Sequence, residues 1–155
     1  MTRYLNKESI AVILFIVVFF GGCIPEPAPI LYGEDQCIYC KMIISEQGYG
    51  AELVTQKGKV YKFDTIECLT AYILKERIEP ERIHSMWAVN FNGTDTLLDV
   101  NKSIFLHSDR LHSPMGLNLS AFSTRGDAED MRQKYGGQLL SWQEVQEFVK
   151  EKWIN

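Results

Sequence analysis

The sequence is poor in histidine and cysteine, and it has no excess of positive charge. It contains three His and four Cys among 155 residues, with 16 Lys and Arg against 20 Asp and Glu. A nucleic-acid-binding surface depends on clustered Lys and Arg that face phosphate, so this acidic chain argues against that class. A closed structural zinc site usually takes four Cys or His ligands at regular spacing, and this sequence has a single Cys-x-x-Cys pair.

The sequence also lacks a hydrophobic run long enough for a permanent membrane span. Its longest run extends from Ile10 to Phe20, which is 11 residues, whereas a spanning helix needs about 20. The run follows Arg3 and Lys7, and this layout is typical of a secretory signal peptide. We therefore predict a signal peptide over residues 1–22 and export of the rest of the chain.

The apolar run ends in a motif that resembles the lipobox of bacterial lipoproteins. In Phe20-Gly21-Gly22-Cys23, two small residues precede a cysteine, although Phe20 stands where leucine is usual. An ordinary signal peptide with an incidental cysteine is the alternative. We predict that Cys23 is acylated, and that several acyl chains hold the protein on the extracytoplasmic face of a bacterial membrane, in the periplasm or at the cell surface.

A proline-rich segment follows the predicted anchor. Pro25, Pro27 and Pro29 fall within five residues, and this spacing disfavours both helix and sheet ladder. We therefore expect residues 23–31 to form a lipid anchor with a semi-rigid, extended spacer. The folded domain is expected to span residues 32–155.

Hydrophobic patterning in residues 32–155 predicts an α+β fold. Asn92-Gly93 marks one hairpin, Gly58 closes another, and capping signals stand at Asp64 with Glu67, at Ser123, and at Ser141 with Glu144. Gly136-Gly137 ends the second helix. Strands are expected over residues 51–54, 59–63, 86–91, 94–100, 104–107 and 117–122, and helices over 64–77, 123–135 and 141–153.

A strand that leads directly into a helix cap occurs twice, at Phe63-Asp64 and at Phe122-Ser123. This repetition favours two small, duplicated units of short antiparallel strands with one helix each, followed by a C-terminal helix. The same succession also arises by chance, so it does not establish duplication on its own.

The stretch Cys37-x-x-Cys40-x-Met42 carries the most chemical information. Two thiols at this spacing can converge on one ion, and a thioether is a soft donor that zinc seldom uses. The pattern therefore favours copper(I). The alternative is a disulfide between Cys37 and Cys40, formed in an oxidising compartment. Its use in thioredoxin-like exchange would require a strand and a helix start around the motif, and neither is predicted there.

Further donors are less certain from pattern alone. Cys68 is interpreted as a spare buried cysteine, with a soft ligand as the alternative, so its loss is expected to weaken copper binding far less than loss of Cys37 or Cys40. Met115 lies between Pro114 and Gly116, where no apolar periodicity requires it, and it is predicted to approach the Cys37–Met42 loop as a ligand. A zinc site would need Cys68 and one histidine among His84, His107 and His112, without supporting spacing.

Five motifs follow one another along the chain: Cys37-x-x-Cys40-x-Met42, Gly58 to Asp64, Ser113-Pro114-Met115-Gly116, Ala121-Phe122-Ser123 and Tyr135 to Trp142. Together they resemble the NosL family of copper-binding lipoproteins, which are accessory to maturation of nitrous oxide reductase. The resemblance implies a pair of homologous αβ units and copper(I) bound through sulfur, with ligand roles carried to Cys37, Cys40 and Met115. Lys41 stands where glycine is frequent, and Cys68 is not universal in the family, which leaves the ligand set open.

The resulting hypothesis is a membrane-anchored copper(I) chaperone with no catalytic step. It would deliver copper to assembly machinery or a recipient protein, for nitrous oxide reductase of denitrification or a similar copper enzyme. The candidate metal ligands are Cys37, Cys40, Met42, Met115 and Cys68. No motif pairs a nucleophile with a base. The alternatives are an extracytoplasmic thiol-disulfide protein and a lipoprotein module that only binds a protein partner.

Overall fold

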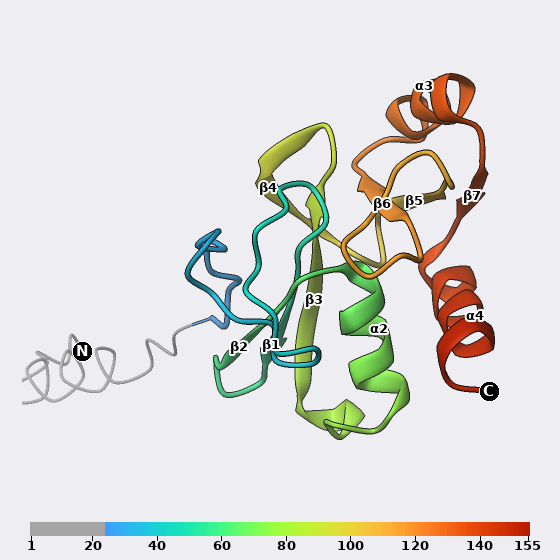
Figure 1. Ribbon diagram of the computed structural model, residues 1–155. Coiled ribbons are helices and arrows are strands. Elements are labelled where there is room, and N and C mark those ends of the chain that lie inside the picture. The colour runs from blue at the N-terminus through green and yellow to red at the C-terminus, as the bar shows by residue number, and fades with distance from the viewer. Residues whose placement is uncertain (1–23) are drawn as a thin grey trace, which may run out of the picture.

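A computed structural model describes residues 24–155 and confirms the α+β fold (Figure 1). In this range, no helix is both long and apolar enough to cross a membrane. The predicted signal peptide and Cys23 lie outside the described residues. The strands are β1 Ala51–Thr55, β2 Val60–Phe63, β3 Ile83–Asn90, β4 Gly93–Asp99, β5 Ile104–His107, β6 Leu119–Phe122 and β7 Gln138–Leu140, and the helices are α2 Ile66–Leu74, α3 Arg125–Tyr135 and α4 Trp142–Trp153, with a short 3-10 turn at Pro80–Arg82.

The seven described strands form one mixed sheet with the order β2-β1-β3-β6-β5-β7, and β4 pairs with β3. Each half of the sheet repeats the same arrangement, because β1 pairs antiparallel with β2 and β3, and β5 pairs antiparallel with β6 and β7. In each half the succession is strand, strand, helix, strand. A single parallel pairing, Asn90 with Ala121, joins the halves. The repeated order agrees with two similar units within one continuous sheet.

Two helix caps differ from the prediction by one residue. Thr65, not Asp64, caps α2, and its hydroxyl accepts a hydrogen bond from the Cys68 backbone N–H at 3.2 Å. Thr124, not Ser123, caps α3. The predicted capping box at the start of α4 is confirmed. The shift matters at α2, because the Asp64 side chain is free of the cap and is buried.

Two further features of α2 differ from the prediction. Glu67 was expected to close a capping box with Asp64, but its side chain is fully buried and hydrogen-bonded to Ser113. The helix ends at Leu74 rather than near Arg77, because Glu76 has a positive φ of 52°. A residue in this left-handed conformation cannot continue a right-handed helix.

The main core lies where α2 and α4 pack on the sheet. The two helices contact each other, and α2 also contacts β1, β2 and β6, as their neighbouring positions in Figure 1 indicate. Phe63, Leu69 and Phe105 are among the largest side chains that are fully buried there. This packing fixes the first turn of α2 against the loops that precede β1 and β6.

The proline-rich segment contacts the domain rather than leaving it at once. The Ala28 N–H donates to the Glu52 carboxylate at 3.0 Å, and the Lys62 ammonium donates to the Pro29 carbonyl at 2.7 Å. A Cβ atom on Gly50 would come within 2.7 Å of the Ile30 side chain. The contacts of the folded part therefore begin at Ala28, before the expected start at Tyr32.

Candidate metal centre

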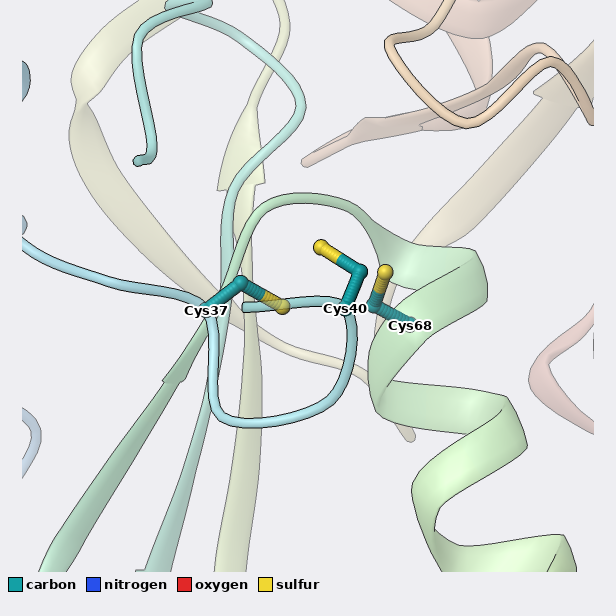
Figure 2. A group of neighbouring side chains, drawn as sticks. All are labelled: Cys37, Cys40 and Cys68. Carbon is teal, nitrogen blue, oxygen red and sulfur yellow. The ribbon is translucent and has the colours of Figure 1, made fainter. Parts of the chain in front are cut away.

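Three thiols from two separate segments gather at one place. The Sγ atoms of Cys37, Cys40 and Cys68 all lie within 4.8 Å of one another. Figure 2 shows that Cys37 and Cys40 come from one loop, that Cys68 comes from the start of α2, and that their sulfur atoms approach one another. Cys37 and Cys68 are buried, whereas Cys40 is partly exposed, and all three are free cysteines.

The loop that holds Cys37 and Cys40 is closed by its own backbone. The Cys37 N–H donates to the Met42 carbonyl at 2.9 Å, and the Lys41 N–H donates to the Cys37 carbonyl at 3.0 Å. Lys41 has a φ of 67°, which turns the chain back on itself. The Ile38 N–H also donates to the Lys62 carbonyl at 3.0 Å. This last bond ties the loop to β2 and so to the chain that enters α2.

Cys68 reaches the same place because the Thr65 cap fixes the first turn of α2. The interpretation of Cys68 as a spare cysteine placed it off the apolar stripe of the helix, and the structure instead brings its sulfur to the other two thiols. The sequence shows a third cysteine, Cys68, without a partner in sequence, in the helix that follows β2. It contains no local signal that β2 pairs by hydrogen bond with the Cys37–Met42 loop.

The three sulfur atoms match the dimensions of a thiolate metal site. With metal–sulfur bonds of about 2.3 Å, three sulfurs around one ion lie roughly 4 Å apart. Soft thiolate ligands at low coordination number suit copper(I). The spacing in this structure therefore allows one soft ion to bind through small side-chain adjustments, without movement of α2.

The three thiols differ in acidity because they hydrogen-bond to one another. The Cys68 thiol donates to Cys37, backbone N–H groups of Asp64 and Cys40 add to it, and the pKa of Cys37 falls to about 5. The same hydrogen bond raises the pKa of Cys68, and burial raises that of Cys40. Among the three thiols, these shifts favour ionisation of Cys37 first.

Two buried acids stand behind the thiols. Burial, with the nearby Cys37 and Glu67 as further causes, raises the pKa of Asp64 to about 6. Burial also raises the pKa of Glu67, whose carboxyl accepts a hydrogen bond from the Ser113 hydroxyl at 2.5 Å. The charged forms of both carboxyls are therefore disfavoured at this end of α2.

The two predicted methionine ligands lie in different surroundings. Met42 is 51% exposed and shares the loop of Cys37 and Cys40. Met115 is partly buried and packs against the core that includes Cys37 and Cys68. Its loop is tied to α2 by the hydrogen bond between Ser113 and Glu67. The structure thus brings together three thiols, while ligand roles for the two thioethers stay predictions.

The histidines do not join this group. Within residues 24–155, the one group of three or more Cys, His, Asp or Glu side chains placed to hold a metal consists of the three thiols. His107 instead packs on the Phe148 ring, with a centroid separation of 4.7 Å, and His84 and His112 are exposed. The geometry therefore offers no support for the zinc alternative built on Cys68 and a histidine.

A comparison with known families agrees with the motifs. The model of the NosL family matches residues 29–149, most of the chain. The chain belongs to the NosL family. Among solved structures, this NosL-family chain is similar to the crystal structure of the copper chaperone NosL from Shewanella denitrificans. The two share 21% sequence identity and a TM-score of 0.68, over 79% of this chain and 96% of the other, which establishes a shared fold. None of the curated proteins matches this sequence.

Proposed function

We propose that this NosL-family chain is a copper(I) chaperone, anchored to the extracytoplasmic face of a bacterial membrane through Cys23. The observation that carries the proposal is the group of three free thiols at Cys37, Cys40 and Cys68. Copper(I) is the cargo, and no bond of an organic substrate is made or broken. The solved structure of a copper chaperone with the same fold supports this assignment.

The graded exposure of the donors suits transfer by ligand exchange. Cys37 and Cys68 are buried, Cys40 is partly exposed, and Met42 is half exposed. A partner's ligand can therefore reach the ion first from the side of Cys40 and displace the protein sulfurs one at a time. The lowered pKa of Cys37 favours its thiolate before copper arrives, whereas the raised pKa values of the other two thiols mean that they lose protons as they bind.

The proposed recipient is the assembly machinery of a copper enzyme, with nitrous oxide reductase as the first choice. The family resemblance of the sequence motifs supports this choice. The alternative in which Cys37 and Cys40 cycle through a disulfide remains the competing function, because these two thiols lie close together.

Metal analysis separates these two functions. The full chain, purified under reducing and anaerobic conditions and supplied with copper(I), should hold one copper per chain. It should show no visible d–d absorption, because copper(I) has a filled d shell. A chain that retains no copper, and whose Cys37 and Cys40 cycle readily through a disulfide, would establish the competing function instead.

Cys23→Ser should move the protein from the membrane fraction while leaving copper binding unchanged. The reason is that acylation requires the Cys23 sulfur, while the three thiols of the metal centre belong to the folded part. Membrane fractionation and the apparent size of the product measure the effect, and Cys68→Ser is a control that should remain in the membrane. If the Cys23 variant stays fully in the membrane at mature size, Cys23 is not the anchor.

Met115→Leu should reduce copper retention or transfer with little change in stability. Leucine keeps the volume and apolarity of the side chain but removes the sulfur donor. Competition against a chromogenic copper(I) chelator measures retention. Met131→Leu is the matched control, because Met131 packs in the separate core beside α3. Equal affinity and equal transfer rates for Met115→Leu and wild type would reduce Met115 to a packing residue of its loop.

A further inference from the structure

A surface groove lies directly beside the loop that carries Cys37 and Cys40. It has a volume of about 380 Å³ and is lined by Ile38, Tyr39, Lys41, Tyr72 and Arg77. Two of its five residues are tyrosines and two are basic. The groove is distinct from the thiol group, but residues 38, 39 and 41 belong to the same short loop as the two cysteines.

Three basic side chains lie in or beside the groove, and the exposed Glu76 lies between two of them in the sequence. The Lys75 ammonium lies 5.5 Å from the centroid of the Tyr39 ring and adds a third cation to Lys41 and Arg77. All three basic side chains are on exposed residues, and none of them pairs with an acid anywhere in residues 24–155. A chain with a net charge of −4 therefore presents a local basic patch next to its metal centre.

Lys41 occupies a backbone conformation that disfavours any side chain. Its φ of 67° lies in the left-handed region, which is unfavourable for a residue other than glycine. Glycine would allow the same turn without this cost. The loop geometry thus does not require lysine, and Lys41 adds a positive charge to the groove.

The neighbouring surface also has apolar character. Met42 and Ile43, which follow Lys41 in the loop, are 51% and 47% exposed. Protein interfaces are enriched in aromatic residues, methionine and arginine, and tyrosine and arginine are frequent among the residues that dominate binding. The loop and the groove together therefore offer exposed apolar side chains, tyrosines and an arginine, as docking surfaces do.

We propose that this basic and tyrosine-lined groove docks an acidic segment of the protein that exchanges copper with this chain. The inference rests on the proposed copper chaperone function, since it names the chemistry of the partner at that same site. Carboxylates of the partner would pair with Lys41, Lys75 and Arg77, and this contact would bring the partner's metal ligands to the partly exposed Cys40. Complementary charge accelerates such encounters and makes them sensitive to salt.

The test uses two synthetic peptides as probes. Both carry a Met-x-x-Met copper-binding sequence, flanked in one by four Asp and Glu residues and in the other by the matching Asn and Gln residues. Binding of labelled peptide to the metal-free full chain in neutral detergent is measured by fluorescence anisotropy, and copper transfer is measured separately. The acidic peptide should bind about tenfold more tightly at low salt, and the difference should vanish at high salt.

Charge-reversal variants connect the effect to the groove. Lys75→Glu with Arg77→Glu should abolish the preference for the acidic peptide without changing copper(I) affinity. The matched control is Arg110→Glu with Lys134→Glu, a basic pair that lies over the ring of Tyr135 at the end of α3, away from the groove. This control should keep the preference. Lys41→Gly should weaken acidic peptide binding several-fold while raising thermal stability, so a loss of binding cannot be attributed to unfolding.

Several outcomes would overturn the proposal. Equal binding of the two peptides to the wild type would do so, as would equal losses in the groove variant and in the control variant. Binding to vesicles with phosphatidylglycerol that depends on Lys75 and Arg77, without a preference for the acidic peptide, would assign the patch to the membrane. A different result would separate the two proposals. If the wild type prefers the acidic peptide but binds no copper(I), the copper chaperone function is wrong, although the groove still binds acidic segments.

Discussion

Replacement of Cys68 by serine is expected to lower copper(I) affinity about as strongly as replacement of Cys37 or Cys40. Its sulfur lies in the same group, within 4.8 Å of the other two, so each serine variant removes one of three soft donors. Loss of a contact behind a metal ligand costs roughly 10- to 100-fold in affinity. Loss of a ligand itself should exceed this range.

Competition against a chromogenic copper(I) chelator under anaerobic conditions measures the three affinities. Thermal unfolding of the metal-free variants is the necessary control, because Cys68 is fully buried and its N–H belongs to the cap of α2. Serine is similar in size to cysteine, and the backbone N–H of residue 68 can still donate to Thr65. If Cys68→Ser retains wild-type affinity, Cys68 is a spare cysteine and the ion relies on the Cys37–Met42 loop.

The free energy of unfolding is expected to depend on Glu52 in the neutral pH range. Glu52 is fully buried on β1, its carboxyl accepts the Ala28 N–H, and Lys62 stands opposite it on β2. Burial raises the pKa of Glu52 from 4.5 to about 7, although Lys62 acts in the opposite direction and Asp35 adds to the rise. The folded state therefore binds a proton that the unfolded state has lost between these two pH values.

The sign of the effect follows from this proton. Between pH 4.5 and about 7 the folded state holds more protons than the unfolded state, so the Glu52 contribution to stability falls as pH rises. The full loss is at most about 3 kcal/mol above pH 7. Glu52→Gln keeps an acceptor for the Ala28 N–H but cannot ionise. We expect it to match wild type near pH 4.5 and to be more stable near pH 8.

Urea denaturation across this pH range, with Glu81→Gln as an exposed control, checks the expectation. The difference between variant and wild type is the quantity to compare, because other groups also contribute. Asp64 acts in the same direction, since its pKa is raised to about 6, while the lowered pKa of Cys37 acts in the opposite direction. A difference that stays constant from pH 4.5 to pH 8 would mean that Glu52 has an ordinary pKa in the folded chain.

Local signals predicted most of the elements. The capping box at Ser141 and Glu144 lies where the sequence indicated it. The predicted hairpin between β3 and β4 is also present, but its turn is at Phe91 and Asn92, and Gly93 begins β4 without a positive φ. Each of these signals acts within a few residues, so it is preserved whatever the rest of the chain does. The caps of α2 and α3 were wrong by one residue, since Thr65 and Thr124 offer the same hydroxyl chemistry as the neighbouring candidates.

The candidate metal centre likewise has one part that local sequence spacing indicated and one part that depends on tertiary contacts. The spacing of Cys37, Cys40 and Met42 was sufficient to place three soft donors on one loop, because they lie within six residues. The sequence did not indicate that the Cys68 sulfur lies beside the other two. Its position depends on the hydrogen bond from Ile38 to Lys62, which joins that loop to the strand before α2. No periodicity within either segment encodes a contact between them.

The sequence by itself determined the α+β class, the NosL family and the pair of cysteines, since these reside in short motifs and their order. The tertiary structure alone decided that a third thiol from α2 completes the group, that Ser113 ties the Met115 loop to Glu67, and that Ala28 rests on Glu52. The physical reason is the range of the interactions. Caps and turns are fixed by neighbours in the chain, whereas each of these contacts joins residues at least 24 positions apart.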